Sequence, residues 1–535
     1  MQPGRVLAPG RQVSDRAGAW TVPLLVGLGV FCVALVGARA LLNDGDTLSH
    51  IAIGRWIIAH RAIPFHDPFT FTARGRTWVP HEWLAEVVFA ILYDRLGWGG
   101  VVAAAGLSGA AAFALLTRVL AKTLGPRRAA IGALAAFALT EAHFLARPHA
   151  LAWPLLVVWM AQVIGARDRG RVPSLVLLPV MILWCNLHGG FVVGLFFAGL
   201  LAAEAVLEAP AAGRMAVIAG WGTFLAGATL AALASPNGVA ALLLPFKMLG
   251  MNFALASISE WHSADFARFD PLEAWIALAI LGGFTLTIRL PMSRILMVLL
   301  LLWMALVHVR NKELLGVVAP LLLAAPLARQ LGPAAPAAEP SAKRGGRAAF
   351  AAGAALAAAV IVGFFAGAWA LDRRGLAPRA DIAPGAALAA ARRAGLDGHV
   401  FNSVRFGGYL MLEDVPTFVD GRADLFGDAF LQRYVGATRA IGNWLPELLD
   451  QYAVRWTLLE PSAPAIGLLG HLPGWRQIYA DPYAVIHRRQ APAPAAAEQR
   501  PSPSSASCYR SIIAPSAPRC AAPLVEARGK ARQLR

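Results

Sequence analysis

The run Trp20–Leu42, WTVPLLVGLGVFCVALVGARALL, decides the fold class of this 535-residue chain. It is long enough to cross a hydrocarbon core of roughly 30 Å as a helix. A helix is required because unpaired backbone polar groups are costly in lipid. Similar runs recur to about position 370, and 57% of the residues are hydrophobic while only 15% are charged. The sequence therefore predicts a polytopic α-helical membrane protein.

Hydrophobic runs of this kind predict about eleven transmembrane helices. The predicted spans are 20–42, 98–121, 129–146, 150–166, 173–187, 190–208, 215–234, 272–289, 294–309, 313–329 and 348–370. The span at 173–187 is short and contains two prolines, so it is one of the weakest of the set.

The basic residues predict the orientation. Arg and Lys concentrate before the first span and in alternate connections, at 118–128, 167–171, 289–294 and 329–347. The positive-inside rule places these segments in the cytoplasm, and the region after Leu371 on the other side. These cytoplasmic Arg and Lys residues explain the formal net charge of +17. We find no nucleic-acid motif and expect no nucleic-acid partner.

Four regions follow from the spans and the composition. We expect a cytoplasmic N-terminus at 1–19, a transmembrane domain at 20–371 with a long first outer loop at 43–97, an extracytoplasmic α/β domain at 372–489 and a disordered tail at 490–535. Within the α/β domain, the patterns predict helices at 384–394, 427–435 and 444–452, and strands at 398–401, 417–420, 455–459, 475–480 and 483–488.

The first outer loop is the most informative segment for chemistry. It begins with Asp44-Gly45-Asp46, followed by His50 four residues after Asp46. Paired carboxylates can bind a divalent cation such as Mg²⁺ or Mn²⁺, or one can act as a general base. Alternatively, Asp46 or Thr47 is an ordinary N-cap of a helix to about His60. We expect that helix to lie in the membrane interface with Asp46 and His50 facing water.

Other polar residues collect on the predicted outer side. The His and Trp residues there can bind substrate or anchor the chain at the interface, and the Arg and Lys residues can neutralise a phosphate or bind lipid headgroups. Those near 402–428 follow strands, where ligand sites form, although Asp-Gly turns and helix caps explain the same pattern. The substrate-binding candidates are His50, His66, Asp67, His81, Glu82, Arg147, His149, Asn186, His188, Glu260, His262, His308, Arg310, Lys312, Tyr409, Asp420, Arg422 and Asp424.

These motifs together resemble the GT-C superfamily of membrane glycosyltransferases, and more closely a set of largely uncharacterised bacterial polytopic proteins described as glycosyltransferase-like. The matching stretches are Asp46-Thr47-x-x-His50, Gly54-Arg55-Trp56, Asp67-Pro68-Phe69, His81–Glu86, Arg147-Pro148-His149, Asn186–Gly190 and Asp420–Asp424. The resemblance implies a bacterial inner-membrane enzyme and a sugar donor linked to polyprenyl phosphate or diphosphate. It also implies that Asp44 or Asp46 is the base or a metal ligand.

One departure from the family limits the acceptor. In oligosaccharyltransferases of the superfamily, a Trp-Trp-Asp pattern lies near a Gly-Tyr pair. Here Gly408-Tyr409 is preceded by Ser403-Val404-Arg405, so the resemblance does not extend to recognition of a peptide acceptor.

Three hypotheses follow for the function. The first is a glycosyltransferase that moves a sugar from a polyprenyl-phosphate-linked donor to an envelope glycan or lipid on the extracytoplasmic side. The second is a non-catalytic factor that binds membrane lipids or assists assembly in envelope polysaccharide biogenesis. The third, a transporter, is disfavoured because the spans contain few charged residues and no evident inverted repeat. The sequence contains no P-loop, dinucleotide fingerprint, HExxH or nucleophile elbow.

Overall fold

The computed structural model describes residues 15–285, 288–331 and 346–490. All of these residues lie in one compact unit. Most of the predicted N-terminal region 1–19 and nearly all of the predicted tail 490–535 lie outside the described residues.

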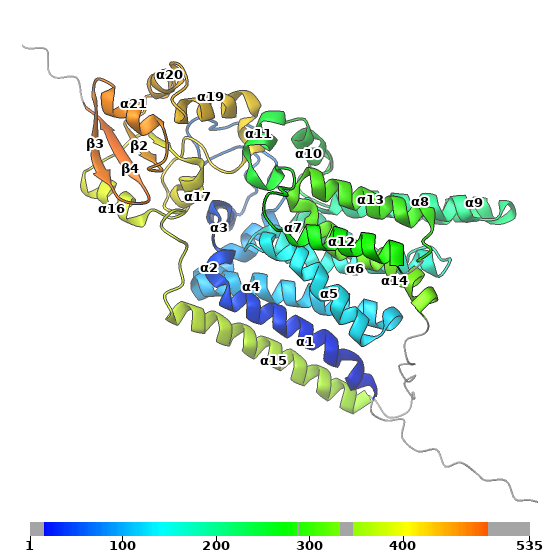
Figure 1. Ribbon diagram of the computed structural model, residues 1–535. Coiled ribbons are helices and arrows are strands. Elements are labelled where there is room, and N and C mark those ends of the chain that lie inside the picture. Colours follow the sequence, from blue (N-terminus) through cyan, green and yellow to red (C-terminus); the bar gives the residue numbers. More distant parts are fainter. Residues whose placement is uncertain (1–14, 286–287, 332–345, 491–535) are drawn as a thin grey trace, which may run out of the picture. The chain divides into compact units, whose positions relative to one another are not determined.

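Each predicted span coincides with a helix (Figure 1). These helices are α1 (Asp15–Val36), α4 (Trp83–Leu124), α5 (Pro126–Thr140), α6 (Pro148–Asp168), α7 (Leu178–Leu187), α8 (Phe191–Glu208), α9 (Arg214–Ala232), α12 (Pro271–Thr285), α13 (Met292–Val307), α14 (Lys312–Leu331) and α15 (Gly346–Arg373). By length and composition, seven helical segments of the described residues can cross a membrane, and four further apolar helices are shorter. The chain is thus a multi-pass membrane protein, but the count of eleven spans is not confirmed.

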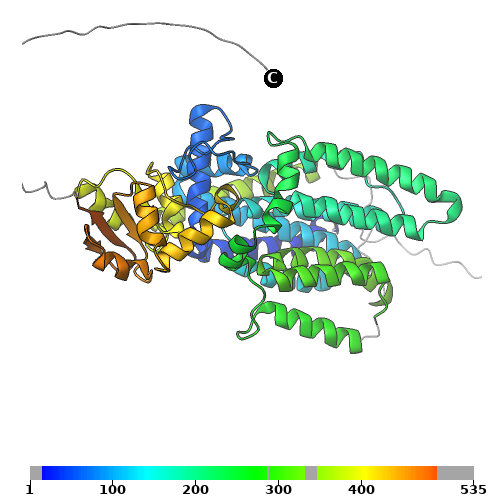
Figure 2. The same cartoon turned by 90° about the horizontal axis from the view of Figure 1, so that it is seen from above.

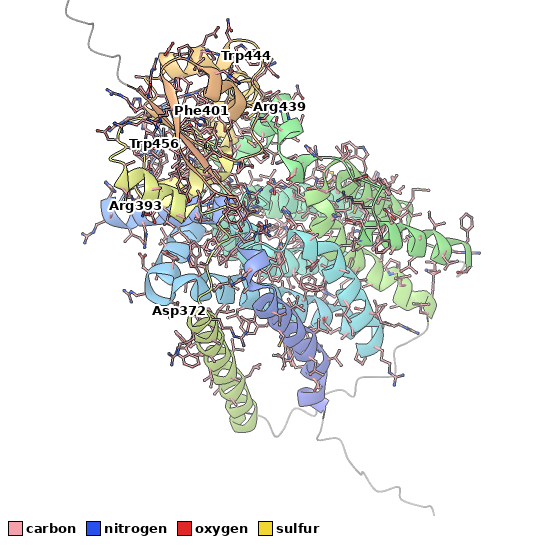
Figure 3. The ribbon with its side chains drawn as sticks, turned by 60° about the vertical axis from the view of Figure 1, so that its left-hand side comes forward. Asp372, Arg393, Phe401, Arg439, Trp444 and Trp456 are labelled. Atoms are coloured by element: carbon pink, nitrogen blue, oxygen red, sulfur yellow. The ribbon has the colours of Figure 1, made fainter. Side chains whose placement is uncertain are left out.

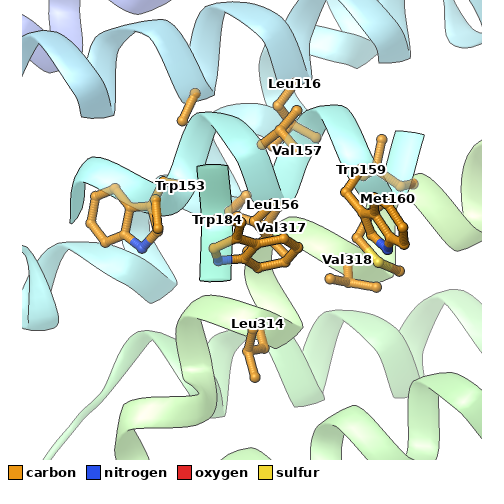
Figure 4. Close-up of a cluster of buried hydrophobic side chains, with 14 of the residues drawn as sticks. Leu116, Trp153, Leu156, Val157, Trp159, Met160, Trp184, Leu314, Val317 and Val318 are labelled. Carbon is orange, nitrogen blue, oxygen red and sulfur yellow. The ribbon is translucent and has the colours of Figure 1, made fainter. Parts of the chain in front are cut away.

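Apolar side chains of several helices form a continuous core between the spans. Three tryptophans of α6 and α7, Trp153, Trp159 and Trp184, are buried in it, and Val317 of α14 packs nearby (Figure 4). Large apolar side chains on α8, α9, α12 and α13 remain exposed, as expected for surfaces that face lipid. Figure 2 shows α8 and α9 side by side.

The first outer loop folds differently from the prediction in one respect. It contains α2 (Ala38–Leu41) and α3 (Gly45–His60), and an extended segment then leads to α4. The expectation that His50 faces water is wrong, because α3 packs between α4 and the C-terminal domain and His50 pairs with Glu82 and Glu86 of the adjoining segment. Helix α4 follows this segment and is kinked at Gly97, where φ is +58°.

The segment predicted as an outer loop at 235–271 also contains helices. These are α10 (Val239–Leu249), α11 (Asn252–Ser257) and the 3₁₀ turn η4 (Ser259–Trp261). The side chain of Asp428 accepts hydrogen bonds from the backbone N–H groups of Phe253 and Ala254 at 2.9 and 3.0 Å. These bonds satisfy free N–H groups at the start of α11 and attach it to the C-terminal domain.

The C-terminal domain is a mixed α/β unit, as predicted. Its strands are β1 (Val400–Asn402), β2 (Trp456–Leu459), β3 (Trp475–Ala480) and β4 (Val485–Arg489), and its helices are α16 (Gly385–Arg393), α17 (Val404–Leu412), α18 (Ala423–Phe426), α19 (Asp428–Thr438), α20 (Trp444–Gln451) and α21 (Ala465–His471). The sheet order is β1-β2-β4-β3, with β1 and β2 parallel and the other pairs antiparallel. Phe401 and Trp456 are buried on adjacent strands of this sheet (Figure 3).

The predicted strand at 417–420 is wrong. Thr417 instead forms an isolated parallel bridge with Thr70 of the first outer loop, and Phe418 N–H donates to the side chain of Asn402 at 2.8 Å. The segment is extended and buried, which gives it the composition of a strand, but its main partner is a loop far away in the sequence. Helices α17 and α21 were not predicted.

Candidate active site at the ends of the spans

Arg147 lies at the centre of an ionic cluster that joins three distant segments of the chain. It is the N-cap residue of α6, and Pro148 follows at the first helical position, where its missing N–H is not needed. Its guanidinium group donates to the carboxylates of Asp44 and Asp46, and its Nη1 lies 3.0 and 3.2 Å from the two oxygens of Glu260. Arg310, in the 3₁₀ turn η5 (Val309–Asn311), lies 3.6 Å from Glu260. We call these five residues the carboxylate–guanidinium cluster.

Local structure fixes the two aspartates. Asp44 is the N-cap of α3 and accepts a hydrogen bond from the backbone N–H of Asp46 at 3.2 Å. Thr47 Oγ1 donates to the carbonyl of Ala146 at 3.1 Å, which attaches the start of α3 to the turn that carries Arg147. The N-cap predicted for Asp46 or Thr47 thus belongs to Asp44, and Asp46 points into the cluster.

Burial and charge separate the pKa values of the carboxyl groups. Burial raises the pKa of Asp46 to about 6, which Asp44 reinforces and Arg147 opposes. At Glu260, burial is outweighed by Arg147, Arg310 and His143, and the pKa falls to about 2. At neutral pH, Glu260 is therefore a permanent anion, while Asp46 titrates close to neutrality, where a general base is most effective.

A second group of side chains adjoins the first and is centred on Glu82. Its oxygens lie 3.6–3.7 Å from nitrogens of His50, His81 and His188, and His50 Nδ1 is 3.2 Å from Glu86. Burial lowers the pKa of His50, but the hydrogen bond to Glu86 and the neighbouring acids outweigh this effect and raise it. Burial lowers the pKa of His188 to about 4, so this ring is neutral at pH 7. We call this set the histidine–glutamate cluster.

Asn186 and His149 lie beside the histidine–glutamate cluster. Asn186 accepts a hydrogen bond from the indole N–H of Trp83 at 2.7 Å, and it donates to the carbonyl groups of Ile182 and Ala234. The rings of His149 and His188 are 6.1 Å apart between centroids. The Arg147-Pro148-His149 and Asn186–Gly190 motifs are thus neighbours in space, as their shared outer position suggested.

Asp67, Asp420 and Arg422 form a separate buried ion group. Arg422 donates to Asp420 at 2.6 and 2.9 Å and to Asp67 at 2.9 Å, and its guanidinium carbon lies 4.7 Å from the ring centroid of Trp78. Burial opposes the charge of Arg422, but the two aspartates outweigh it and raise the pKa well above the usual value. The pairing of Arg422 with Asp67 and Asp420 connects the first outer loop to the C-terminal domain.

The remaining predicted site residues are not members of these clusters. His66 and His262 are exposed, and His308 bonds to the carbonyl of Trp261 at 2.7 Å. Lys312 is buried and pairs with Asp270 at 2.7 Å. Two further candidates belong to the C-terminal domain: Tyr409 is half-buried on α17, and burial raises the pKa of Asp424 on α18.

The sequence did not predict three residues that border the site. Glu86 pairs with His50, His143 Nε2 lies 3.5 Å from Glu260, and Glu313 accepts a hydrogen bond from Trp153 at 3.1 Å. His143 was assigned to the interior of a span, and Glu313 to the first residue of another. A charged or polar residue at the end of an apolar run is the signal that could have identified them.

The solved structures that resemble this chain include two membrane enzymes. The oligosaccharyltransferase of Archaeoglobus fulgidus, tethered with an acceptor peptide containing the NVT sequon, is 11% identical, with 81% of this chain and 68% of that chain covered and a TM-score of 0.45. ArnT from Cupriavidus metallidurans bound to undecaprenyl phosphate is 15% identical, with 89% and 100% covered and a TM-score of 0.48.

No family model matches the chain, and no curated protein does. The roles given to residues below therefore come from the geometry of this chain.

Proposed function

We propose that this protein is a membrane glycosyltransferase that transfers a sugar from a polyprenyl-phosphate-linked donor to an envelope glycan or lipid acceptor. The observation that carries the proposal is the carboxylate–guanidinium cluster. It brings a carboxyl group with a pKa of about 6, that of Asp46, next to the guanidinium group of Arg147, and Glu260 connects Arg147 to a second guanidinium group, that of Arg310. A base and a phosphate-binding group are the two parts that such a transfer requires.

The chemistry assigns a role to each part. The acceptor hydroxyl oxygen attacks C1 of the donor sugar and forms the new glycosidic bond, while its proton passes to the carboxylate of Asp46. The bond between C1 and the phosphate oxygen breaks, and its electron pair leaves with the polyprenyl phosphate. Arg147 and Arg310 stabilise the phosphate charge, since a guanidinium fork matches phosphate geometry. Asp44 and Glu260 hold Arg147 in place.

The location of the reaction is part of the proposal. The positive-inside rule puts the N-terminus in the cytoplasm of a bacterium and the C-terminal domain in the periplasm. The clusters lie at the ends of the spans that this orientation turns outward, so the donor would be used on the periplasmic side of the inner membrane. We also retain the division at 371, with a transmembrane domain before it and a periplasmic domain at 372–489.

Release of polyprenyl phosphate from a panel of polyprenyl-phosphate-linked sugars tests the proposal. The full-length protein in detergent should release lipid phosphate with at least one donor. Asp46→Asn should lower this rate by roughly 10²- to 10⁴-fold, the usual contribution of a general base. The wild-type rate should also rise as the pH passes through about 6, since the base must be ionised.

Asp94→Asn is the matched control. Asp94 is an exposed carboxylate that accepts from Arg55 at 2.8 Å, outside both clusters, so this variant should keep its activity. The alternative function, a lipid-binding or assembly factor, is favoured by the fact that Arg147 already engages both aspartates. A folded wild-type protein that is inactive on every donor, or Asp46→Asn with full activity, would support that alternative.

A further inference from the structure

His143, His149 and Glu313 bring three metal-ligating side chains together beside the carboxylate–guanidinium cluster. His143 ends the 3₁₀ turn η1 (Glu141–His143), His149 is in the first turn of α6, and Glu313 is in the first turn of α14. One ligating atom from each residue lies within 4.8 Å of the other two. The imidazole rings are stacked with 4.9 Å between centroids. A single ion could therefore contact all three with small side-chain movements.

Hydrogen bonds orient two of these side chains. His149 is buried, and its Nε2 lies 3.0 Å from the carbonyl oxygen of His143, which places the proton on Nε2 and leaves the lone pair on Nδ1. Glu313 accepts from the indole N–H of Trp153 at 3.1 Å. Partners of this kind fix the orientation of metal ligands in known sites.

The surroundings of these residues are acidic, which favours binding of a cation. Three carboxyl groups beside these residues, those of Asp44, Asp46 and Glu260, share the guanidinium groups of Arg147 and Arg310. Acidic groups therefore outnumber guanidinium groups here. Burying uncompensated charge is costly, and a divalent cation would compensate it.

The aspartates of the first outer loop are less suitable ligands. Both contact Arg147, whose guanidinium group occupies the side of each carboxylate that faces the cluster. A metal ion at Asp44 and Asp46 would have to displace this group, whereas the two histidines and Glu313 make no ion pair with it. The structure thus favours a different place for a metal than the one predicted from the paired aspartates.

We propose that His143, His149 and Glu313 bind one divalent transition-metal ion, with Zn²⁺ as the best match. Two imidazoles and one carboxylate form a three-ligand set that leaves a coordination position open for water or substrate. Mg²⁺ and Ca²⁺ prefer all-oxygen ligands and should bind weakly. The proposal does not depend on glycosyl transfer, because the site is defined by its ligands alone.

Metal binding to the full-length protein tests this directly. The protein is purified in detergent through a histidine-free tag, stripped with a chelator and titrated with Co²⁺, whose visible absorption reports nitrogen and oxygen ligands. One Co²⁺ per chain should bind and be displaced by Zn²⁺ but not by excess Mg²⁺. His149→Gln and Glu313→Gln should each weaken binding by about 100-fold or more, since loss of even an outer-shell partner costs 10- to 100-fold.

Four further variants complete the test. His143→Gln is a second probe at a less buried ligand, in case His149→Gln does not fold, and thermal unfolding checks each variant. His262→Gln removes an exposed histidine outside the site and should bind Co²⁺ normally. Asp44→Asn and Asp46→Asn should also retain the ion. Absence of stoichiometric binding to wild type, or loss in the aspartate variants with retention in His149→Gln and Glu313→Gln, would overturn the proposal.

Discussion

A single guanidinium group holds the carboxylate–guanidinium cluster together. Arg147 contacts Asp44, Asp46 and Glu260, which come from segments about a hundred residues away on either side. Removing one partner of a buried ion pair typically costs roughly 3–5 kcal/mol, because the remaining charges lose their compensation. At the scale of single residues, Arg147 therefore has both a structural and a chemical role, and a variant at Arg147 would change both at once. A variant at Asp46 tests the proposed base while Arg147 stays in place.

Asp46→Asn should change how stability depends on pH. The pKa of Asp46 is about 6 in the folded protein and 3.8 ordinarily, so folding favours its protonated form. The stability from this protonation is fully present below the unfolded pKa and is lost as pH rises through about 6. The asparagine variant does not titrate, so its Tm relative to wild type should be higher at about pH 7.5 than at about pH 5. A difference in Tm that stays constant over this range would contradict the shifted pKa.

At the scale of elements, α3 is closely packed against α4 and α17. A Cβ at Gly54 would lie 2.0 Å from the carbonyl oxygen of Glu86, and one at Gly408 would lie 2.0 Å from that of Gly45. Helix α3 is thus held between α4 and α17 at two glycine contacts. This packing keeps His50 within hydrogen-bond distance of Glu86.

Gly54→Ala should move α3 away from α4. Overpacking of a tight contact typically costs about 1–3 kcal/mol, and the displaced His50 would no longer reach Glu86. We expect a lower Tm and weaker activity in this variant. Gly199→Ala on α8 is the control, because a Cβ there meets no atom within 4 Å, and its Tm should not fall. Equal stability of the two variants would show that α3 is not closely packed.

Hydropathy predicted the elements of the membrane part well because it is a local property. Every apolar run forms a helix, and α16 and the four sheet strands lie close to their predicted positions. The failures involve tertiary contacts. Thr417 pairs with a residue almost 350 positions earlier, and α3 was expected to expose His50 to water but packs between α4 and α17. No local pattern could indicate those partners.

The candidate site also combines features that local sequence predicts with features that depend on tertiary contacts. The sequence placed Asp44, Asp46 and Arg147 on one side of the membrane, and the structure brings them into contact. It did not identify His143 or Glu313, since the hydropathy of the surrounding residues assigned both to predicted spans. Their proximity depends on how α5, α6 and α14 pack, which is a property of the assembled bundle.

At the scale of the whole molecule, Arg422 connects the first outer loop to the C-terminal domain. It bridges Asp67 and Asp420, and Thr72 Oγ1 donates to the carbonyl of Phe418 at 2.6 Å beside it. The described residues form one compact unit. The clusters lie close to this joint, since Gly421 contacts Asp46.

Arg422→Gln should loosen this joint. Leaving Asp67 and Asp420 buried without a cation should cost roughly 3–5 kcal/mol, and limited proteolysis should cut the 61–82 segment faster. Arg392→Gln is the control, since its pair with Glu413 at 3.0 Å is exposed and such pairs contribute about 0–1 kcal/mol. Equal proteolysis rates for the two variants and wild type would mean that Arg422 does not hold the domain in place.

The contact between Gly421 and Asp46 limits how this protein can diverge. A Cβ at position 421 would lie 1.9 Å from Asp46 Oδ1, so any larger residue there requires a compensating change at position 46. Two positions separated by most of the chain must therefore change together during evolution. A chimera that exchanges the C-terminal domain between distant homologues should fold only when the first outer loop comes from the same parent.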